Sequence, residues 1–213
     1  MFVLGVHLRG RRMFKKLNPF YKASGPVEFV VAGLGNPGRE YENTRHNMGF
    51  WAVDLLAREL GFECKKLKFK SLCGDCMAEG KRVLFLKPST FMNKSGEAVR
   101  DALAFYKIPP QRLLVISDDA ALPLGKLRIR KKGSDGGQKG LRSIIYLLGD
   151  DEFPRIRVGI GAKAHPDMEL ADWVLGRVTK DEEKALTPVF ADVITATKLI
   201  IAGKTDEAMN RFN

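Results

Sequence analysis

Three polar side chains and one histidine stand at positions where an α/β protein would place its chemistry. Asn36, Asn93 and Asp118 each follow an apolar run that is typical of a buried strand, and His46 opens the helix predicted after the first run. Ligands of α/β sheets bind at the carboxyl ends of the strands. We therefore expect the four side chains to converge on one cleft at one edge of a sheet.

These residue types favour hydrolysis of an activated ester. A neutral histidine can remove a proton from water near neutral pH, an adjacent carboxylate can fix its tautomer, and an amide can stabilise a developing oxyanion. The G-x-S-x-G and GxxxxGK[ST] patterns are both missing from the chain, so water is the expected nucleophile. Taken alone, each residue also has an ordinary explanation, because Asn and Asp are common in turns and a single His is more often structural.

Two weaker patterns indicate other chemistry. The loop Gly33-Leu-Gly-Asn-Pro-Gly38 satisfies GxGxxG, but Pro37 and Gly38 extend a turn where a dinucleotide-binding fold needs a helix, so we expect no such cofactor. Cys73 and Cys76 have the spacing of half a zinc site, yet no second pair completes four ligands. We interpret the three cysteines as incidental thiols and expect no metal site.

The charge of the chain favours a polyanionic partner. The formal net charge is +11, and basic side chains gain free energy by releasing counterions from a phosphate backbone. Residues 1–25 hold six basic and no acidic residues, and we interpret them as a flexible basic leader before a domain of residues 26–213. Residues 126–140 join a basic strand to a glycine-rich loop and a helix start, which suits a phosphate, although a solvated basic edge strand would look the same.

Apolar patterns predict the elements that position these residues. Helical spacing recurs within residues 52–60, 99–106 and 141–148, and the longest helix is expected to run from the capping box Thr179-x-x-Glu182 to Gly203. Some strand connections are too short for parallel crossovers. The predicted fold is a single α/β domain with a mixed, mostly parallel, twisted sheet sandwiched between helices. No apolar window is long enough to span a bilayer, so we expect a soluble cytoplasmic protein. Strands are expected at residues 27–32, 83–87, 113–117, 126–130 and 155–160.

Together the motifs resemble the bacterial-type peptidyl-tRNA hydrolase family from about residue 27 to residue 213. Four ordered motifs are far more specific than any one of them. The resemblance implies a monomeric enzyme, without metal or cofactor, that cleaves the ester between a peptide and the terminal ribose of tRNA and so recycles tRNA from aborted translation. The motifs are Gly33-Leu-Gly-Asn-Pro-Gly-Arg-Glu-Tyr41, Asn43-Thr-Arg-His-Asn-Met-Gly-Phe50, Lys87-Pro-Ser-Thr-Phe-Met-Asn-Lys-Ser-Gly96 and the Gly-Ser-Asp-Gly-Gly loop at residues 133–137.

The resemblance also implies a role for each matching residue. His46 would be the catalytic base, Asp118 its supporting carboxylate and Asn93 a ligand of the water or the oxyanion. Asn36 would help to distinguish N-blocked peptidyl-tRNA from free aminoacyl-tRNA.

Other matching positions concern the substrate, and two of them depart from the family pattern. Tyr41 and Phe91 would line the substrate cleft, although many relatives have Tyr where Phe91 stands. Many relatives also have His-Asn where this chain has Gln138-Lys139. Lys139 thus replaces an amide expected to contact substrate, and we expect it to bind the tRNA backbone by charge instead.

Catalysis is expected to survive these departures because the base and its carboxylate remain. The chief alternative is a non-catalytic RNA-binding protein on the same scaffold, as in plant relatives that resemble this family yet assist intron splicing. A nucleotide-dependent oxidoreductase would depend only on the weak glycine pattern.

Overall fold

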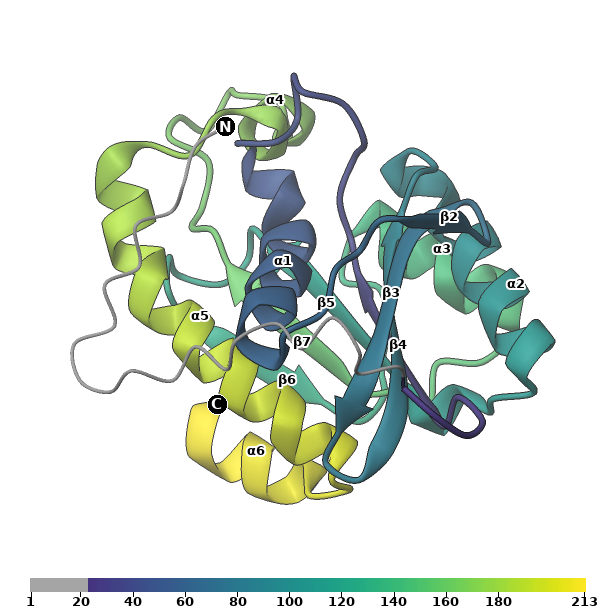
Figure 1. Cartoon of the computed structure of the whole chain (residues 1–213). Helices are drawn as coiled ribbons and strands as arrows, with labels where there is room; N and C mark the ends of the chain where they lie inside the picture. Colours follow the sequence, from purple (N-terminus) through teal and green to yellow (C-terminus); the bar gives the residue numbers. More distant parts are fainter. Residues whose placement is uncertain (1–22) are drawn as a thin grey trace.

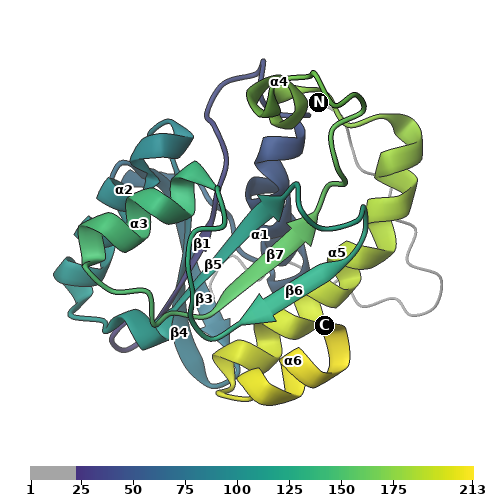
Figure 2. The same ribbon diagram turned by 180° about the vertical axis from the view of Figure 1, so that it is seen from behind.

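A seven-stranded sheet with helices on both faces forms the molecule (Figures 1 and 2). The computed structural model describes residues 23–213, so the leader predicted for residues 1–25 lies outside the described part, except for residues 23–25. The strand order is β2-β3-β4-β1-β5-β7-β6. The four central strands are parallel, namely β4 (Lys81–Pro88), β1 (Phe29–Gly33), β5 (Leu113–Asp119) and β7 (Arg155–Gly159). The other three strands lie outside these four and are antiparallel to their neighbours, namely β2 (Lys66–Lys68), β3 (Ser71–Ala78) and β6 (Leu127–Arg130). The predicted mixed α/β fold is confirmed.

Helices cover each face of the sheet in a separate layer (Figure 2). One face carries α1 (Met48–Leu60), α5 (Lys180–Ile201) and α6 (Thr205–Phe212). The other face carries α2 (Ser95–Tyr106) and α3 (Lys139–Leu148). The short α4 (Leu170–Leu175) lies beyond the carboxyl ends of the central strands (Figure 1). Three 3-10 turns, η1 (Arg45–Asn47), η2 (Met92–Lys94) and η3 (Pro110–Arg112), precede α1, α2 and β5.

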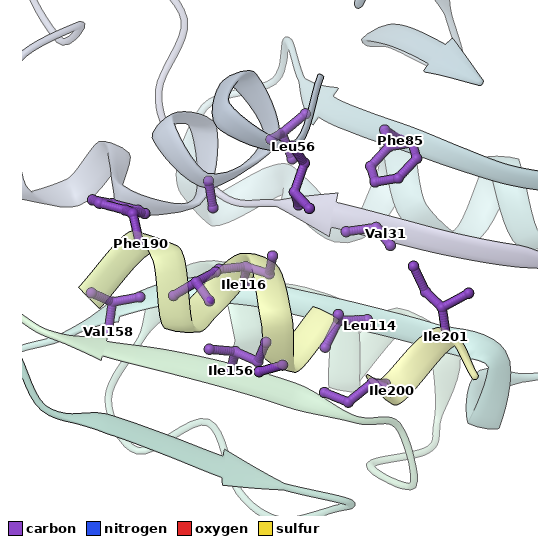
Figure 3. Packing of buried hydrophobic residues seen from close by; sticks show 14 of the residues in the cluster. Val31, Leu56, Phe85, Leu114, Ile116, Ile156, Val158, Phe190, Ile200 and Ile201 are labelled. Carbon is purple, nitrogen blue, oxygen red and sulfur yellow. The ribbon is translucent and has the colours of Figure 1, made fainter. Parts of the chain in front are cut away.

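The two layers are held by two hydrophobic cores, because the side chains of a strand alternate between the faces of a sheet. Val31 points into the core beneath α1 and α5, while Val30 points into the core beneath α2 and α3. Figure 3 shows Val31 near Leu56 and Phe85. Full burial of such a side chain contributes about 1.5 to 3 kcal/mol, so β1 is anchored from both faces and its carboxyl end is a rigid base for the loop that follows.

Most of the predicted elements are confirmed to within a few residues. The capping box at Thr179 is formed in full: the Thr179 hydroxyl accepts from the Glu182 N–H, and the Thr179 N–H donates to the Glu182 carboxylate. Helix α5 begins at the next residue after Thr179. The hairpin of β2 and β3 was not predicted, and neither were α4 and α6. β3 contains Gly74 and Asp75, which interrupt the apolar pattern, and it is stabilised as a strand by pairing along all of β4.

The glycine motif begins at the last residue of β1, and Cys73 and Cys76 both belong to β3. Residues 33–38 form a strand end and a turn, and no helix begins among them, which agrees with the rejection of a dinucleotide fold. Cys73 and Cys76 lie in the two different cores, on opposite faces of the sheet. Within residues 23–213, no group of three His, Cys, Asp or Glu side chains could hold a metal, and no helix there is long and apolar enough to cross a membrane.

Candidate active site

His46 and Asp118 form a buried pair at the carboxyl edge of the sheet. The Nδ1 atom of His46 lies 2.8 Å from Oδ2 of Asp118, and their side chains are 11% and 3% exposed. Because an ionised carboxylate only accepts hydrogen bonds, Nδ1 carries the proton in this contact. The tautomer thus fixed leaves Nε2 with a free lone pair, as a general base requires.

The pair forms because two neighbouring parallel strands end at the same edge. Asp118 is the penultimate residue of β5, which therefore extends past the predicted end at residue 117. His46 lies in η1, between β1 and α1, and β1 is hydrogen-bonded to β5. The crossing from β1 to α1 thus returns over the end of β5 and places the imidazole above the carboxylate.

Arg45 anchors the turn that holds His46. Its guanidinium makes a bidentate ion pair with Glu182 at the start of α5, with contacts of 3.0 and 2.9 Å, and lies 3.8 Å from the centre of the Trp173 ring. The backbone N–H of Arg45 also donates to the Gly176 carbonyl. The histidine turn is therefore tied to both α4 and α5.

Asn36 is held by three hydrogen bonds at the end of β1. Its backbone N–H donates to the side chain of Asn47, and the Asn47 amide donates to the Asn36 carbonyl. The Asn36 side-chain oxygen accepts a 2.8 Å hydrogen bond from the N–H of Met92. Because the oxygen of the amide is occupied, its NH₂ group is the part of the side chain available to a ligand.

A cavity of about 780 Å³ opens beside the pair of His46 and Asp118. Its walls include Asn36, His46, Phe91, Asn93 and Asp118. Cations and apolar side chains are both present on the remaining walls, the former suited to a polyanion and the latter to a hydrophobic chain. These further lining residues include Lys139, Arg157, Lys163, Leu170, Val174 and Leu175.

The glycine-rich loop of residues 133–137 is hydrogen-bonded to a side chain of β7. Arg155 is 2% exposed and donates to the carbonyls of Gly133, Ser134 and Asp151. Burial of its guanidinium lowers the pKa of Arg155 to about 10. The loop therefore has a fixed position relative to the end of the sheet.

Arg157 supports the same loop at the cavity wall. It lies against Gly136, where a β-carbon would collide with its guanidinium, and Gly136 has a left-handed φ of 55°. Its Nε atom is 3.0 Å from Oδ2 of Asp119, an ion pair whose angle is too poor for a hydrogen bond. The pair holds the cation beside the cavity with its charge partly compensated.

The structure brings together most of the predicted site residues. His46, Asp118, Asn36, Asn93, Phe91 and Lys139 all line the one cavity. Tyr41 is not on its wall, and instead packs edge-on against Phe91, with 6.4 Å between the ring centres.

Gln138 contacts the carboxylate of Asp118, although the sequence predicts no role for it. Its side-chain Nε2 donates to Oδ1 of Asp118 at 3.2 Å. The residue was noted only as a departure from the family pattern. The capping position at the start of α3 was the available sign, since an N-cap side chain points back over the helix end and toward the strand edge.

Comparison with known proteins agrees with this geometry. The sequence model of the family described as Peptidyl-tRNA hydrolase matches residues 30–213. A peptidyl-tRNA hydrolase of Thermoanaerobacter sp. (strain X514) is 52% identical over 185 residues, which cover 87% of this chain and 99% of that protein. One from Carboxydothermus hydrogenoformans is 49% identical over 87% of this chain and 98% of its own length. The crystal structure of peptidyl-tRNA hydrolase from Acinetobacter baumannii superposes with a TM-score of 0.80 at 35% identity, covering 88% of this chain and 96% of that one. With a family match over most of its length, close relatives and a shared fold, the chain belongs to the peptidyl-tRNA hydrolase family.

Proposed function

We propose that this protein hydrolyses the ester bond between the peptide and the 3′-terminal ribose of peptidyl-tRNA, with water as the nucleophile. Membership of the family supports the reaction, and the relatives named above are peptidyl-tRNA hydrolases. The observation on which the proposal depends most is the 2.8 Å contact of His46 with Asp118 beside a cavity large enough for a peptide end. Release of free tRNA and free peptide would recycle tRNA from aborted translation.

Proton transfer by His46 drives the reaction. The Nε2 atom takes a proton from water, the resulting hydroxide attacks the ester carbonyl carbon, and a tetrahedral intermediate forms. Asp118 stabilises the imidazolium that exists only after this transfer. The imidazolium then returns the proton to the ribose oxygen as the carbon–oxygen bond breaks, so the base is regenerated.

Asn93 and Asn36 act on the two carbonyl groups of the substrate. Asn93 is exposed on the cavity wall and donates its amide to the developing oxyanion or holds the water. Asn36 offers its free NH₂ group, which matches the carbonyl oxygen of a preceding peptide bond. An unblocked aminoacyl-tRNA presents an ammonium donor there instead, and two donors cannot pair. Discrimination against aminoacyl-tRNA follows from this mismatch.

The remaining contacts bind the two ends of the substrate. Lys139 is exposed at the first position of α3 and binds the tRNA backbone by charge. Phe91, supported by Tyr41, forms an apolar wall for the peptide. The proposal further includes a monomeric, cytoplasmic enzyme that acts without metal or cofactor.

Hydrolysis of N-acetyl-aminoacyl-tRNA and of unblocked aminoacyl-tRNA, each with and without EDTA, tests this function. The wild-type protein should cleave only the blocked substrate, equally in chelator, and His46→Ala should abolish cleavage. Equal rates for wild type and His46→Ala would refute the role of His46, and no cleavage by the wild-type protein would favour the alternative of a non-catalytic RNA-binding protein. Loss of activity in EDTA would refute the metal-independent mechanism.

A further inference from the structure

Gln138 lies at the centre of the hydrogen bonds that surround the catalytic pair. Its Nε2 group donates to Oδ1 of Asp118 at 3.2 Å and approaches the sulfur of Met92 at 3.2 Å. Its Oε1 atom accepts a 2.8 Å hydrogen bond from the N–H of Leu141 and so caps α3. The residue is buried, with 7% of its surface exposed. One side chain thus connects the catalytic carboxylate, the segment that contacts Asn36 and the start of a helix.

We propose that Gln138 is a positioning residue that holds Asp118 in the orientation in which its Oδ2 atom meets His46. This inference rests on the proposed function. A carboxylate can turn about its last bond, and only a partner on each oxygen fixes that torsion. His46 occupies Oδ2 and Gln138 occupies Oδ1, and Asp118 is 2% exposed, so solvent offers little replacement for a lost donor.

The amide of Gln138 has no ionisation in the accessible pH range, which makes this support independent of pH. Charged groups of β5 and of other elements line the same cavity, and their fields act on His46 whether or not Gln138 is present. They are Asp119 of β5, Arg157 of β7, Lys139 of α3, and Lys163 and Glu169 in the loop before α4. A His at this position would instead place a second titrating ring against Asp118. We therefore infer that residue 138 adds no ionisation of its own to the pH–rate profile of this protein.

The competing explanation is that Gln138 only caps α3, and two substitutions separate the roles. Gln138→Ser keeps a hydroxyl oxygen able to accept from Leu141, because Ser is a favoured N-cap residue, but its side chain is too short to reach Asp118. Gln138→Ala removes both the cap and the donor. A residue that acts only as a cap would lose stability in Gln138→Ala and lose nothing in Gln138→Ser.

We expect Gln138→Ser to lower the melting temperature less than Gln138→Ala does, because the cap is kept, while kcat on N-acetyl-aminoacyl-tRNA falls about 10- to 100-fold, as for a lost hydrogen bond to a buried charge. KM should change little, because the lost contact acts through Asp118. Gln138→Ala should show the same fall in kcat together with a lower melting temperature. Gln138→His should keep kcat close to the wild-type value above neutral pH, since its ring can donate to Asp118. It should also add a second ionisation to the acid limb of the pH–rate profile.

Wild-type and His46→Ala proteins in the same assay keep failure of this inference apart from failure of the proposed function. If wild type is inactive, the proposed function fails. If wild type is active, His46→Ala is inactive and Gln138→Ser retains full kcat, then Gln138 does not position Asp118 and the inference alone is overturned. An unchanged single-ionisation profile in an active Gln138→His variant would overturn the part that concerns pH.

Discussion

Replacement of Asp118 by Asn should cost about three orders of magnitude in rate without loss of the fold. A general base takes up a proton during the reaction, so the interaction of His46 with the carboxylate becomes an ion pair only when the imidazole takes the proton from water. Two unit charges about 4 Å apart attract by about 4 kcal/mol at an effective dielectric constant of about 20. This stabilisation exists only in the transition state and beyond, so it should appear in kcat. Since about 1.4 kcal/mol corresponds to a tenfold change in rate, Asp118→Asn should lower kcat about 10³-fold.

The structure adds a second reason for the loss. An Asn at this position can turn its NH₂ group toward Nδ1 of His46, which would move the ring proton to Nε2 and remove the base. The substitution preserves volume and removes one buried charge, while Gln138 can still contact the remaining oxygen. KM and the melting temperature should therefore stay close to the wild-type values.

Single-turnover hydrolysis of N-acetyl-aminoacyl-tRNA by the Asp118→Asn, His46→Ala and double variants measures this coupling. Residues that act as one unit are not additive, so the double variant should be no slower than the slower single variant. A loss below about 10-fold in Asp118→Asn would show that no ion pair develops in the transition state. A double-variant loss equal to the product of the single losses would show that the two residues act separately.

Three further predictions concern stability. Burial raises the pKa of Cys76 to about 12, so the free energy of unfolding should fall as pH rises from 9 toward 12, and Cys76→Ala should lack that part of the fall in urea titrations. Glu182→Gln breaks the bidentate pair with Arg45 and should lower the free energy of unfolding by about 2 kcal/mol, less than for a fully buried pair; an unchanged urea midpoint would show that the pair contributes nothing. Gly49→Ala should lower the free energy of unfolding by about 1 to 3 kcal/mol through overpacking, and it should also lower kcat. Gly61→Ala, at the other end of α1, should lower the free energy of unfolding by about 1 kcal/mol because of the left-handed φ of this residue, and it should leave kcat unchanged. Equal effects of the two glycine variants on kcat would show that the position of His46 does not depend on the close backbone contacts of Gly49.

The fold could be predicted where the residues of a single strand or helix show by themselves which of its faces are buried. β1 and β5 are buried on both faces, so their apolar runs stand out from the sequence alone. β3 is different, because its Asp75 is stabilised by an ion pair with Arg82 on the neighbouring strand. Such a contact is a tertiary effect that overrides local propensity, and no pattern within the strand itself indicates it.

The candidate site divides in the same way. The meeting of His46 and Asp118 could be predicted because Asp118 lies near the carboxyl end of one strand, His46 follows the neighbouring parallel strand, and such strand ends share an edge. The direction of a side-chain amide has no such rule. From its capping position Gln138 could have pointed into solvent, and Tyr41 could have faced the cavity. The sequence does not show that Gln138 instead contacts Asp118 and that Tyr41 packs against Phe91. Sequence spacing predicts which residues meet at an edge, and packing decides which atoms of those residues face one another.

Two glycines, Gly33 and Gly49, determine how closely His46 can approach Asp118. A β-carbon on Gly49 would collide with the backbone of Leu34 and with the carbonyl of Ile116, and one on Gly33 would collide with the carbonyl of Gly49. The first turn of α1 therefore lies directly on β1 and β5, closer than any side chain would allow. His46 precedes this turn by two residues, so its height above the end of β5 depends on that contact. An imidazole reaches a carboxylate at 2.8 Å only because helix and sheet meet here backbone to backbone, and the chemistry at the cavity is in this sense a consequence of packing in the layer beneath it.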